Sequence, residues 1–216
     1  EVAKIVKKNI NRPNNHLKSF IFNTIGVSDG MSMGTSGMNY SLPSRELIAD
    51  SIECFVKAHH YDGVICIPGC DKNLPGSLMG LIRINRPSFI IYGGSISPGK
   101  YQNKDVDIVN AFQSYGELQN NKITNQEREE LLQACCQGSG ACGGMYTANT
   151  MAVAIEAMGM SIPYSSSNLA LSNDKKKECQ QSYNTLLNLI ENDIKPSDII
   201  TKKSIINAIK TIIVFG

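Results

Sequence analysis

Three adjacent residues in one short loop have side chains that suit metal chemistry. The stretch "CIPGCDKNLPG" (66–76) places Cys70, Asp71 and Lys72 side by side between Gly/Pro turns. A cysteine thiolate is a soft ligand, whereas an aspartate carboxylate is a hard oxygen ligand. A lysine ammonium repels a cation, but a neutral lysine amine reacts with carbon dioxide to give a carbamate, an anionic oxygen ligand suited to Mg²⁺. The local sequence leaves open a metal site, a redox loop or an ordinary turn.

The seven cysteines favour free or metal-binding thiols over disulfides, because a chain of 216 residues does not need disulfides to stabilise its fold. No C-x-x-C spacing occurs, so structural zinc and thioredoxin-type chemistry lack their usual pattern. Cys142, like Cys70, lies in a Gly-rich loop whose backbone can approach a cluster, and a metal role for this pair stays open. Cys135 and Cys136, at the mouth of the same loop, are ambiguous. We expect structural roles for the three cysteines within predicted helices or strands: Cys54, Cys66 and Cys179.

Two further motifs have ordinary interpretations. Asp29, in "SDG", fits a turn. The stretch 138–143, "GSGACG", matches G-x-G-x-x-G, but a dinucleotide site needs a strand before it and an acidic residue about 20 positions later. A charged amphipathic helix is predicted before this stretch, so we do not expect dinucleotide binding.

Apolar patterning predicts an α/β fold with a mainly parallel sheet flanked by helices, because strands and helices alternate. Asp29 and the Cys70–Lys72 loop follow predicted strands at their carboxyl ends, the edge at which such sheets bind ligands. We expect strands at 19–25, 63–68 and 88–94, a helix from Ser44 to about His59, and further helices at 77–84, 105–117, 125–136, 147–160, 174–192 and 201–212.

The overall composition is that of an ordinary soluble globular protein, with 42% hydrophobic and 19% charged residues. The formal net charge of +2 gives no reason to expect a nucleic-acid partner. No apolar run reaches the roughly 18 residues of a membrane span, and no signal-peptide pattern opens the sequence.

Several long stretches together resemble the dihydroxy-acid/6-phosphogluconate dehydratase family. The most specific are "FNTIGVSDGMSMGTSGM", "GCDKNLPGSLMG" and "GSGACGGMYTANTMAVAIEAMGMSIPYSSS", and the resemblance runs from about Phe22 to the last residue. Within the family, these stretches are most similar to the dihydroxy-acid dehydratase branch, which uses a [2Fe-2S] cluster in branched-chain amino-acid biosynthesis. The resemblance implies that residues 1–216 form the cluster- and Mg²⁺-binding N-terminal-type domain of that family.

Five residues match functional positions of the family. The resemblance implies that Cys70 and Cys142 bind the cluster, either [2Fe-2S] or alternatively [4Fe-4S]. It also implies that Asp29 and Asp71 bind Mg²⁺ and that Lys72 is carbamylated to complete the magnesium site.

The activity implied by the resemblance is that of a hydro-lyase that converts 2,3-dihydroxy-3-methyl carboxylic acids into 2-oxo acids. Such an enzyme is expected to be a homodimer with a small-molecule substrate, in the cytoplasm of bacteria or in plastids or mitochondria of eukaryotes. Two alternatives remain: a sugar-acid or 6-phosphogluconate dehydratase of the same family, and a non-catalytic α/β module.

The sequence also departs from the family pattern. The family's first cluster cysteine lies in a P-C-N-x-H-L block, whereas "RPNNHL" (12–17) has no cysteine. The glutamate that completes the family's Mg²⁺ site and the serine expected to act as base belong to a C-terminal β-barrel-like domain. Cys135 and Gln137 stand where relatives usually have Ser and Pro. We therefore expect the 216-residue chain alone to be catalytically incompetent, and we assign it no catalytic residue.

Overall fold

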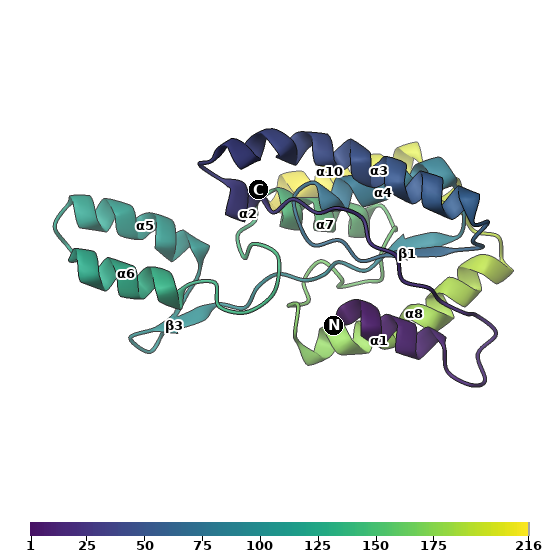
Figure 1. Cartoon of the computed structure of the whole chain (residues 1–216), viewed down its shortest axis with the longest axis horizontal. Coiled ribbons are helices and arrows are strands. Elements are labelled where there is room, and N and C mark those ends of the chain that lie inside the picture. Colours follow the sequence, from purple (N-terminus) through teal and green to yellow (C-terminus); the bar gives the residue numbers. More distant parts are fainter. Residues whose placement is uncertain (216) are drawn as a thin grey trace.

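A computed structural model describes residues 1–215 and shows a small parallel sheet between layers of helices (Figure 1). Strand β1 (Val64–Cys66) pairs in parallel with β2 (Ser88–Ile90), with Cys66 opposite Ile90. A parallel bridge between Ile90 and Ser161 continues the sheet beyond β2. The predicted fold class, an α/β domain with a mainly parallel sheet flanked by helices, is confirmed.

Side chains alternate along the two strands between two hydrophobic cores, as the period of a strand dictates. Cys66 and Ile90 belong to one core, whereas Phe89 belongs to the other, where the half-buried Ile65 also packs. Figure 1 shows helices on both sides of the strands. The first core is covered by α3 (Ser41–Ala58), α4 (Asn73–Ile84) and α7 (Thr147–Ala157), and the second by α1 (Val2–Ile10) and α8 (Asn173–Glu191).

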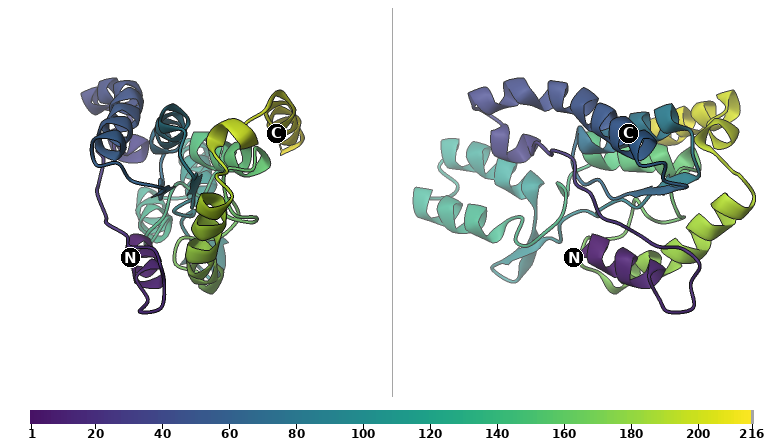
Figure 2. Two further views of the ribbon diagram at one scale, coloured as in Figure 1. Left: turned by 90° about the vertical axis from the view of Figure 1, so that its right-hand side faces the viewer. Right: turned by 45° about the vertical axis from the view of Figure 1, so that its right-hand side comes forward.

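Four short or terminal helices complete the body of the molecule, whose layers are seen end-on in Figure 2. Helix α10 (Lys202–Phe215) lies against α7. None of the helices within residues 1–215 is long and apolar enough to cross a membrane. The four are α2 (Asp29–Ser32), the 3₁₀ helix η1 (Ser36–Tyr40), α9 (Pro196–Ile199) and α10 (Lys202–Phe215).

An arm, defined as residues 99–136, projects from the body beside α2 and has a small core of its own (Figure 1). It begins with a hairpin whose two turn residues, Gln102 and Asn103, both have positive φ, as a tight two-residue turn requires. Its elements are β3 (Gly99–Tyr101), β4 (Lys104–Val106), α5 (Ile108–Gln119) and α6 (Asn125–Ala134).

Several element predictions differ from the structure. Helix α4 begins at Asn73, four residues before the predicted start at 77, and the strands predicted at 63–68 and 88–94 are only three residues long. The 19–25 segment belongs to no strand within the described residues. Residues 105 and 106 lie in β4, and α5 begins only at Ile108 because Asp107 forms a capping box with Asn110. Helix α3 begins at Ser41 rather than at Ser44, whose hydroxyl donates to the Ser41 carbonyl.

Two glycines allow α4 to lie unusually close to α3. A Cβ atom on Gly76 would lie 2.7 Å from the Arg45 carbonyl oxygen, and one on Gly80 would lie 2.9 Å from Cβ of Ile52. The apolar residues Ile48 and Ile52 fill the space that the glycines leave. This contact fixes the start of α4, and with it the preceding loop, relative to α3.

We expect Gly76→Ala to destabilise the fold by about 1–3 kcal/mol, because the backbone oxygen of Arg45 has no room to move away. Gly116→Ala, in the middle of α5, is the matched control, since a Cβ there meets nothing within 4 Å. That control should gain about 0.5–1 kcal/mol from helix propensity. Urea unfolding followed by circular dichroism measures both, and equal stabilisation of the two variants would contradict the close-packing account.

Candidate functional site

The carboxylate of Asp29 is held in place from two sides. Asp29 is the first residue of α2 and is only 7% exposed. The Ser41 hydroxyl donates to Oδ1 of Asp29 at 2.7 Å, and the Lys72 ammonium donates to Oδ2 at 3.3 Å. Asp29 and Lys72 are 43 residues apart in sequence, so this ion pair joins the segment around α2 to the start of α4.

Asp71 lies against the same carboxylate. Burial raises the pKa of Asp71, and the neighbouring charge of Asp29 raises it further, while the Lys72 ammonium and a hydrogen bond with Thr147 lower it. Two carboxylates therefore lie near one ammonium in a half-buried site, and Asp29 forms the ion pair with it. Their mutual repulsion is the kind that a bound divalent cation relieves, and oxygen donors are the ligands that Mg²⁺ prefers.

Cys70 and Cys142 lie around one buried tyrosine. Cys70 lies in the loop between β1 and α4, and Cys142 lies in the loop before α7. Burial raises the pKa of the Tyr92 hydroxyl, and negative charge on Cys70, Cys142 and Asp71 raises it further. The structure therefore brings both predicted cluster cysteines near Tyr92, with Asp71, and through it Asp29 and Lys72, alongside.

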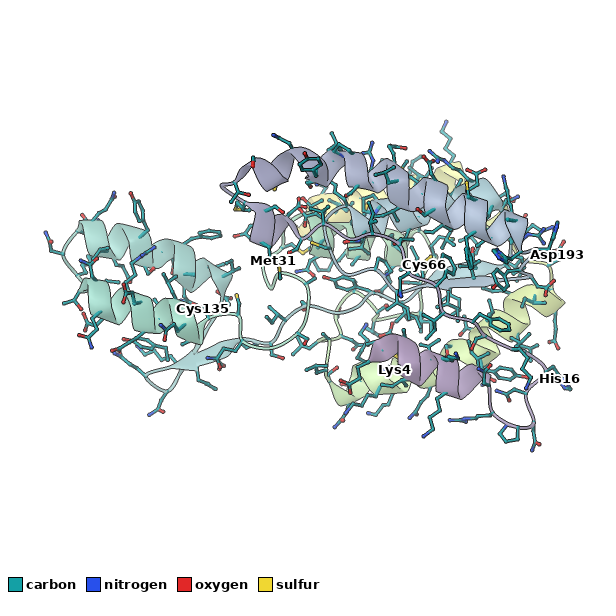
Figure 3. The ribbon with its side chains drawn as sticks, viewed as in Figure 1. Lys4, His16, Met31, Cys66, Cys135 and Asp193 are labelled. Atoms are coloured by element: carbon teal, nitrogen blue, oxygen red, sulfur yellow. The ribbon has the colours of Figure 1, made fainter. Side chains whose placement is uncertain are left out.

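Two of the other cysteines are poor ligand candidates. Burial raises the pKa of Cys66 to about 12 and that of Cys179 to about 11, so both remain protonated thiols at neutral pH. This agrees with the structural role expected for them. Cys54 is exposed on α3. Figure 3 shows Cys66 in the body of the molecule and Cys135 at the base of the arm.

Cys136 is closer to the candidate site than its neighbour. Burial raises its pKa, and negative charge on Cys135 and then on Cys142 raises it further. Its φ of 54° is in the left-handed region, which a cysteine seldom adopts. Cys136 thus lies beside the loop that carries Cys142, as its position in the sequence suggested.

The thiols fit the predicted iron–sulfur cluster and the carboxylates fit the predicted Mg²⁺ by chemical type, but few donor atoms are present for either cofactor. Within residues 1–215, no group of three or more His, Cys, Asp or Glu side chains lies close enough together to hold a metal ion. The described residues thus offer two thiols for a soft centre, and two carboxylates with a lysine for a hard one.

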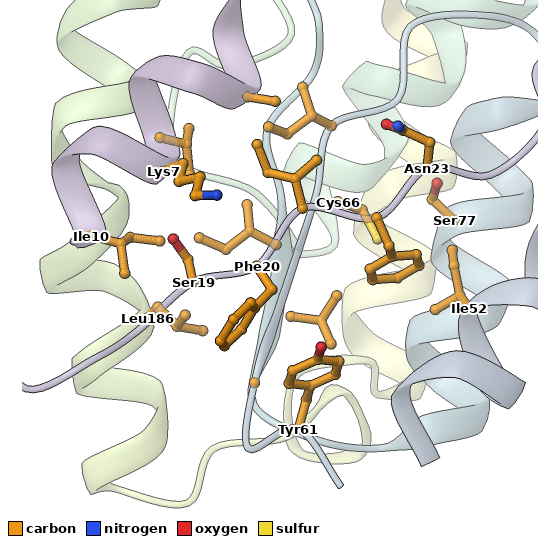
Figure 4. A pocket seen from close by; sticks show the side chains of 18 of the residues that line it. Lys7, Ile10, Ser19, Phe20, Asn23, Ile52, Tyr61, Cys66, Ser77 and Leu186 are labelled. Carbon is orange, nitrogen blue, oxygen red and sulfur yellow. The ribbon is translucent and has the colours of Figure 1, made fainter. Parts of the chain in front are cut away.

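A large cavity of about 760 Å³ borders Gly69 and Asn73, on either side of the Cys70–Lys72 loop, but is lined by none of the five predicted site residues (Figure 4). It lies between the 16–26 segment, α1 and β1, and Phe20, Ile52 and Leu186 are among the apolar side chains that line it. We place the candidate site at Cys70–Lys72 instead, because the charged and thiol side chains converge there.

The structure adds four residues that sequence reasoning did not single out. Ser41 hydrogen-bonds to Asp29 and Thr147 lies beside Asp71, while Tyr92 and Asn149 lie beside the cysteines. Only Tyr92 carried a usable signal, since a polar aromatic residue ends the otherwise apolar "SFIIY" run at the carboxyl edge of the sheet.

These features define an α/β domain in which the loop after β1, the start of α2 and the loop before α7 bring together a thiol pair and a carboxylate pair. The whole chain, residues 1–216, matches the family model for the N-terminal part of dihydroxy-acid/6-phosphogluconate dehydratases, and the chain belongs to this family.

Curated relatives make the similarity more specific. A protein of Francisella tularensis subsp. tularensis named dihydroxy-acid dehydratase is 57% identical over 216 residues, which cover all of this chain and 39% of the relative. The chloroplastic dihydroxy-acid dehydratase of Arabidopsis thaliana is 54% identical over the whole chain and 35% of the relative. The dihydroxy-acid dehydratase of Lactococcus lactis subsp. lactis is 50% identical over 98% of this chain and 37% of the relative. The chain thus spans less than two fifths of the length of these relatives.

We expect Asp71→Asn to stabilise the metal-free protein at pH 7. Because the folded-state pKa of Asp71 is raised, its stabilising contribution is present below the ordinary value of 3.8 and is lost as pH rises through the folded-state pKa. The half-buried position limits the gain to about 3 °C in Tm. The gain should shrink as the pH falls towards 4.

Thermal unfolding in EDTA at pH 7 and at pH 4 measures the effect. Asp62→Asn, at an exposed position just before β1, is the control and should leave Tm unchanged. A lower Tm for Asp71→Asn at pH 7 would contradict the proximity of the two carboxylates.

Proposed function

We propose that this chain forms the metal-binding part of a dehydratase that removes water from a 2,3-dihydroxy-3-methyl carboxylic acid to give a 2-oxo acid. The observation that carries the proposal is the position of residues 70–72, where a thiol of the soft pair directly precedes two residues of the hard site. The family match and the names of the relatives support the same reaction.

In this proposal Cys70 and Cys142 bind an iron–sulfur cluster, of the [2Fe-2S] type or alternatively [4Fe-4S]. Both cysteines are only partly buried, unlike Cys66 and Cys179, so their sulfur atoms remain accessible to a cluster. Two cysteines do not complete a cluster site, and the third ligand would come from outside the described residues.

Asp29, Asp71 and Lys72 bind Mg²⁺ in the same proposal. As an ammonium, Lys72 neutralises part of the carboxylate charge. As a carbamate it would carry a negative charge instead, and three anionic groups in a half-buried site require a cation. Carbamylation and Mg²⁺ binding should therefore depend on each other.

Loss of a hydroxyl group is slow because hydroxide is a poor leaving group. When bound, the cluster and Mg²⁺ supply positive charge to the leaving oxygen and to the substrate carboxylate. The chain's own residues bind and orient these groups: Ser41 fixes the Asp29 carboxylate and Thr147 contacts Asp71. We propose that residues 1–216 act as one domain and that the base is supplied from outside them, so this chain alone is inactive.

We expect Cys70→Ser and Cys142→Ser each to abolish cluster binding by the full-length gene product purified anaerobically. Iron and acid-labile sulfide analysis together with visible absorption measures the loss, and activity should fall by at least about a hundredfold. Cys54→Ser, at an exposed position on α3, is the matched control and should retain both. The fold of each variant is checked by circular dichroism.

The full-length wild-type protein, purified anaerobically in the same way, also tests which reaction is catalysed. Mg²⁺-dependent formation of a 2-oxo acid from 2,3-dihydroxy-3-methylbutanoate is the expected result. Faster turnover of 6-phosphogluconate or a sugar acid would instead assign the other branch of the family. A wild-type protein with neither a cluster nor activity would overturn the enzyme proposal in favour of a non-catalytic α/β module.

We expect Lys72→Arg to abolish the stabilisation of the protein by Mg²⁺, because arginine keeps the positive charge but forms no carbamate. In the wild-type protein supplied with ¹³C-bicarbonate, a carbamate carbon signal should grow when Mg²⁺ is added. The Lys57→Arg variant, at an exposed ion pair with Glu53, serves as control and should behave as wild type. A wild-type protein with no carbamate signal at saturating Mg²⁺ contradicts the role given to Lys72.

A further inference from the structure

A buried ion pair lies against the backbone of Tyr92. The Lys175 side chain is 1% exposed and that of Glu178 is 3% exposed. The Lys175 ammonium lies 2.7 Å from Oε2 of Glu178 and donates to the carbonyl oxygens of Tyr92 at 2.6 Å and of Ser165 at 3.2 Å. All three donors of the ammonium thus have a partner.

The remaining polar groups close a ring of hydrogen bonds. The backbone N–H of Tyr92 donates to the Ser165 hydroxyl at 3.0 Å, and that hydroxyl donates to Oε1 of Glu178. The Asn168 amide donates to Oε2 of Glu178 at 3.0 Å. Tyr92 is therefore held at both its N–H and its C=O by groups that are themselves fully paired.

Stability alone is a weak explanation for this ring. Moving two charges out of water costs several kcal/mol per ion, and an apolar pair of similar size often stabilises a fold as well or better. What the ring does provide is a fixed position for one residue, Tyr92, just beyond the end of β2.

The Tyr92 side chain connects this fixed residue to the loop that carries Cys142 through hydrogen bonds of Asn149. Its hydroxyl donates to Oδ1 of Asn149 at 2.6 Å, which orients the amide so that Nδ2 faces the opposite way. Nδ2 of Asn149 then donates to the carbonyl oxygens of Cys142 at 2.8 Å and of Gly144 at 2.6 Å. One tyrosine hydroxyl thus fixes the backbone on both sides of Gly143.

We propose that Tyr92 and Asn149 are positioning residues that hold Cys142 at a fixed place relative to Cys70. Tyr92 is suited to this because it lies near both cysteines, and because the ring with Lys175 and Glu178 anchors it to the body of the molecule. The functional meaning of the proposal rests on the proposed cluster, whereas the mechanical link can be measured without it.

The first experiment uses the 216-residue chain without metals. Tyr92→Phe keeps the hydrogen bonds of the Tyr92 backbone to Ser165 and Lys175, but it leaves Oδ1 of Asn149 without its donor. We expect hydrogen exchange of the amides from 142 to 146 to accelerate about tenfold, and alkylation of Cys142 relative to Cys54 to speed up similarly. Tyr183→Phe is the matched control, since its hydroxyl accepts from the His16 N–H far from the loop, and it should change neither rate.

The second experiment uses the full-length protein loaded with cluster. We expect Tyr92→Phe and Asn149→Asp to retain the wild-type circular dichroism spectrum but to shorten the lifetime of the cluster in air about tenfold and to change its visible spectrum. The double variant should be no worse than the more affected single variant, because both substitutions interrupt the same chain of hydrogen bonds from Tyr92 through Asn149 to the Cys142 loop. Additive losses would contradict this.

The two experiments separate the two claims. Faster exchange of the loop in Tyr92→Phe, together with a wild-type protein that binds no cluster, would support the mechanical link and overturn the proposed function. Exchange and cluster lifetime identical to wild type in Tyr92→Phe would overturn the positioning role even if the cluster is present.

Discussion

The ion pair between Lys72 and Asp29 is the interaction on which the site depends. It joins residues 43 positions apart, and it is the point where the segment around α2 meets the loop that starts α4. With Asp71 beside it, the pair concentrates two carboxylates around one ammonium in a half-buried place. Such an arrangement is poor as a stabilising device but well suited to receiving a cation, because removing or inverting the lysine charge leaves the carboxylates without a partner.

Packing elsewhere in the fold holds this meeting point in place. Gly76 and Gly80 let α4 approach α3 closely, which fixes the loop carrying Cys70 and Asp71. On the other side of the sheet, the buried pair of Lys175 and Glu178 anchors Tyr92, whose hydroxyl leads through Asn149 to the loop of Cys142. The two Gly-rich loops that carry Cys70 and Cys142 are therefore each held by packed neighbours, the first by the contact of α4 with α3 and the second by Tyr92 and Asn149.

The sequence predicted the outline of the fold because its signals are local. The apolar runs around β1 and β2 and the helical spacing of Ile48, Ile52 and Val56 indicated the right elements. The 19–25 run looked equally strand-like, but pairing depends on a neighbour that local pattern does not describe. The β3–β4 hairpin was missed because its strands are only three residues long and partly charged.

The candidate site could be predicted only in part from the sequence. The resemblance indicated five residues, and the structure places them near one another, but their metal-binding roles remain proposals. Ser41 and Asn149 could not be found, because hydrogen bonds to residues 12 and 57 positions away leave no pattern in the sequence. Lys175 and Glu178 lie in a stretch, "NDKKKE", that reads as a solvated helix start, and only tertiary packing reveals that both are buried.

The central claim is that residues 70–72 join two different metal centres, and a spin-coupling measurement tests it most directly. Mn²⁺ replaces Mg²⁺ in the cluster-loaded, full-length protein, and the electron spin relaxation of the reduced cluster is compared with and without it. The account predicts faster relaxation of the cluster when Mn²⁺ is bound, and no such change in the Asp71→Asn variant. Relaxation that is unaffected by bound Mn²⁺ in the wild-type protein would contradict it.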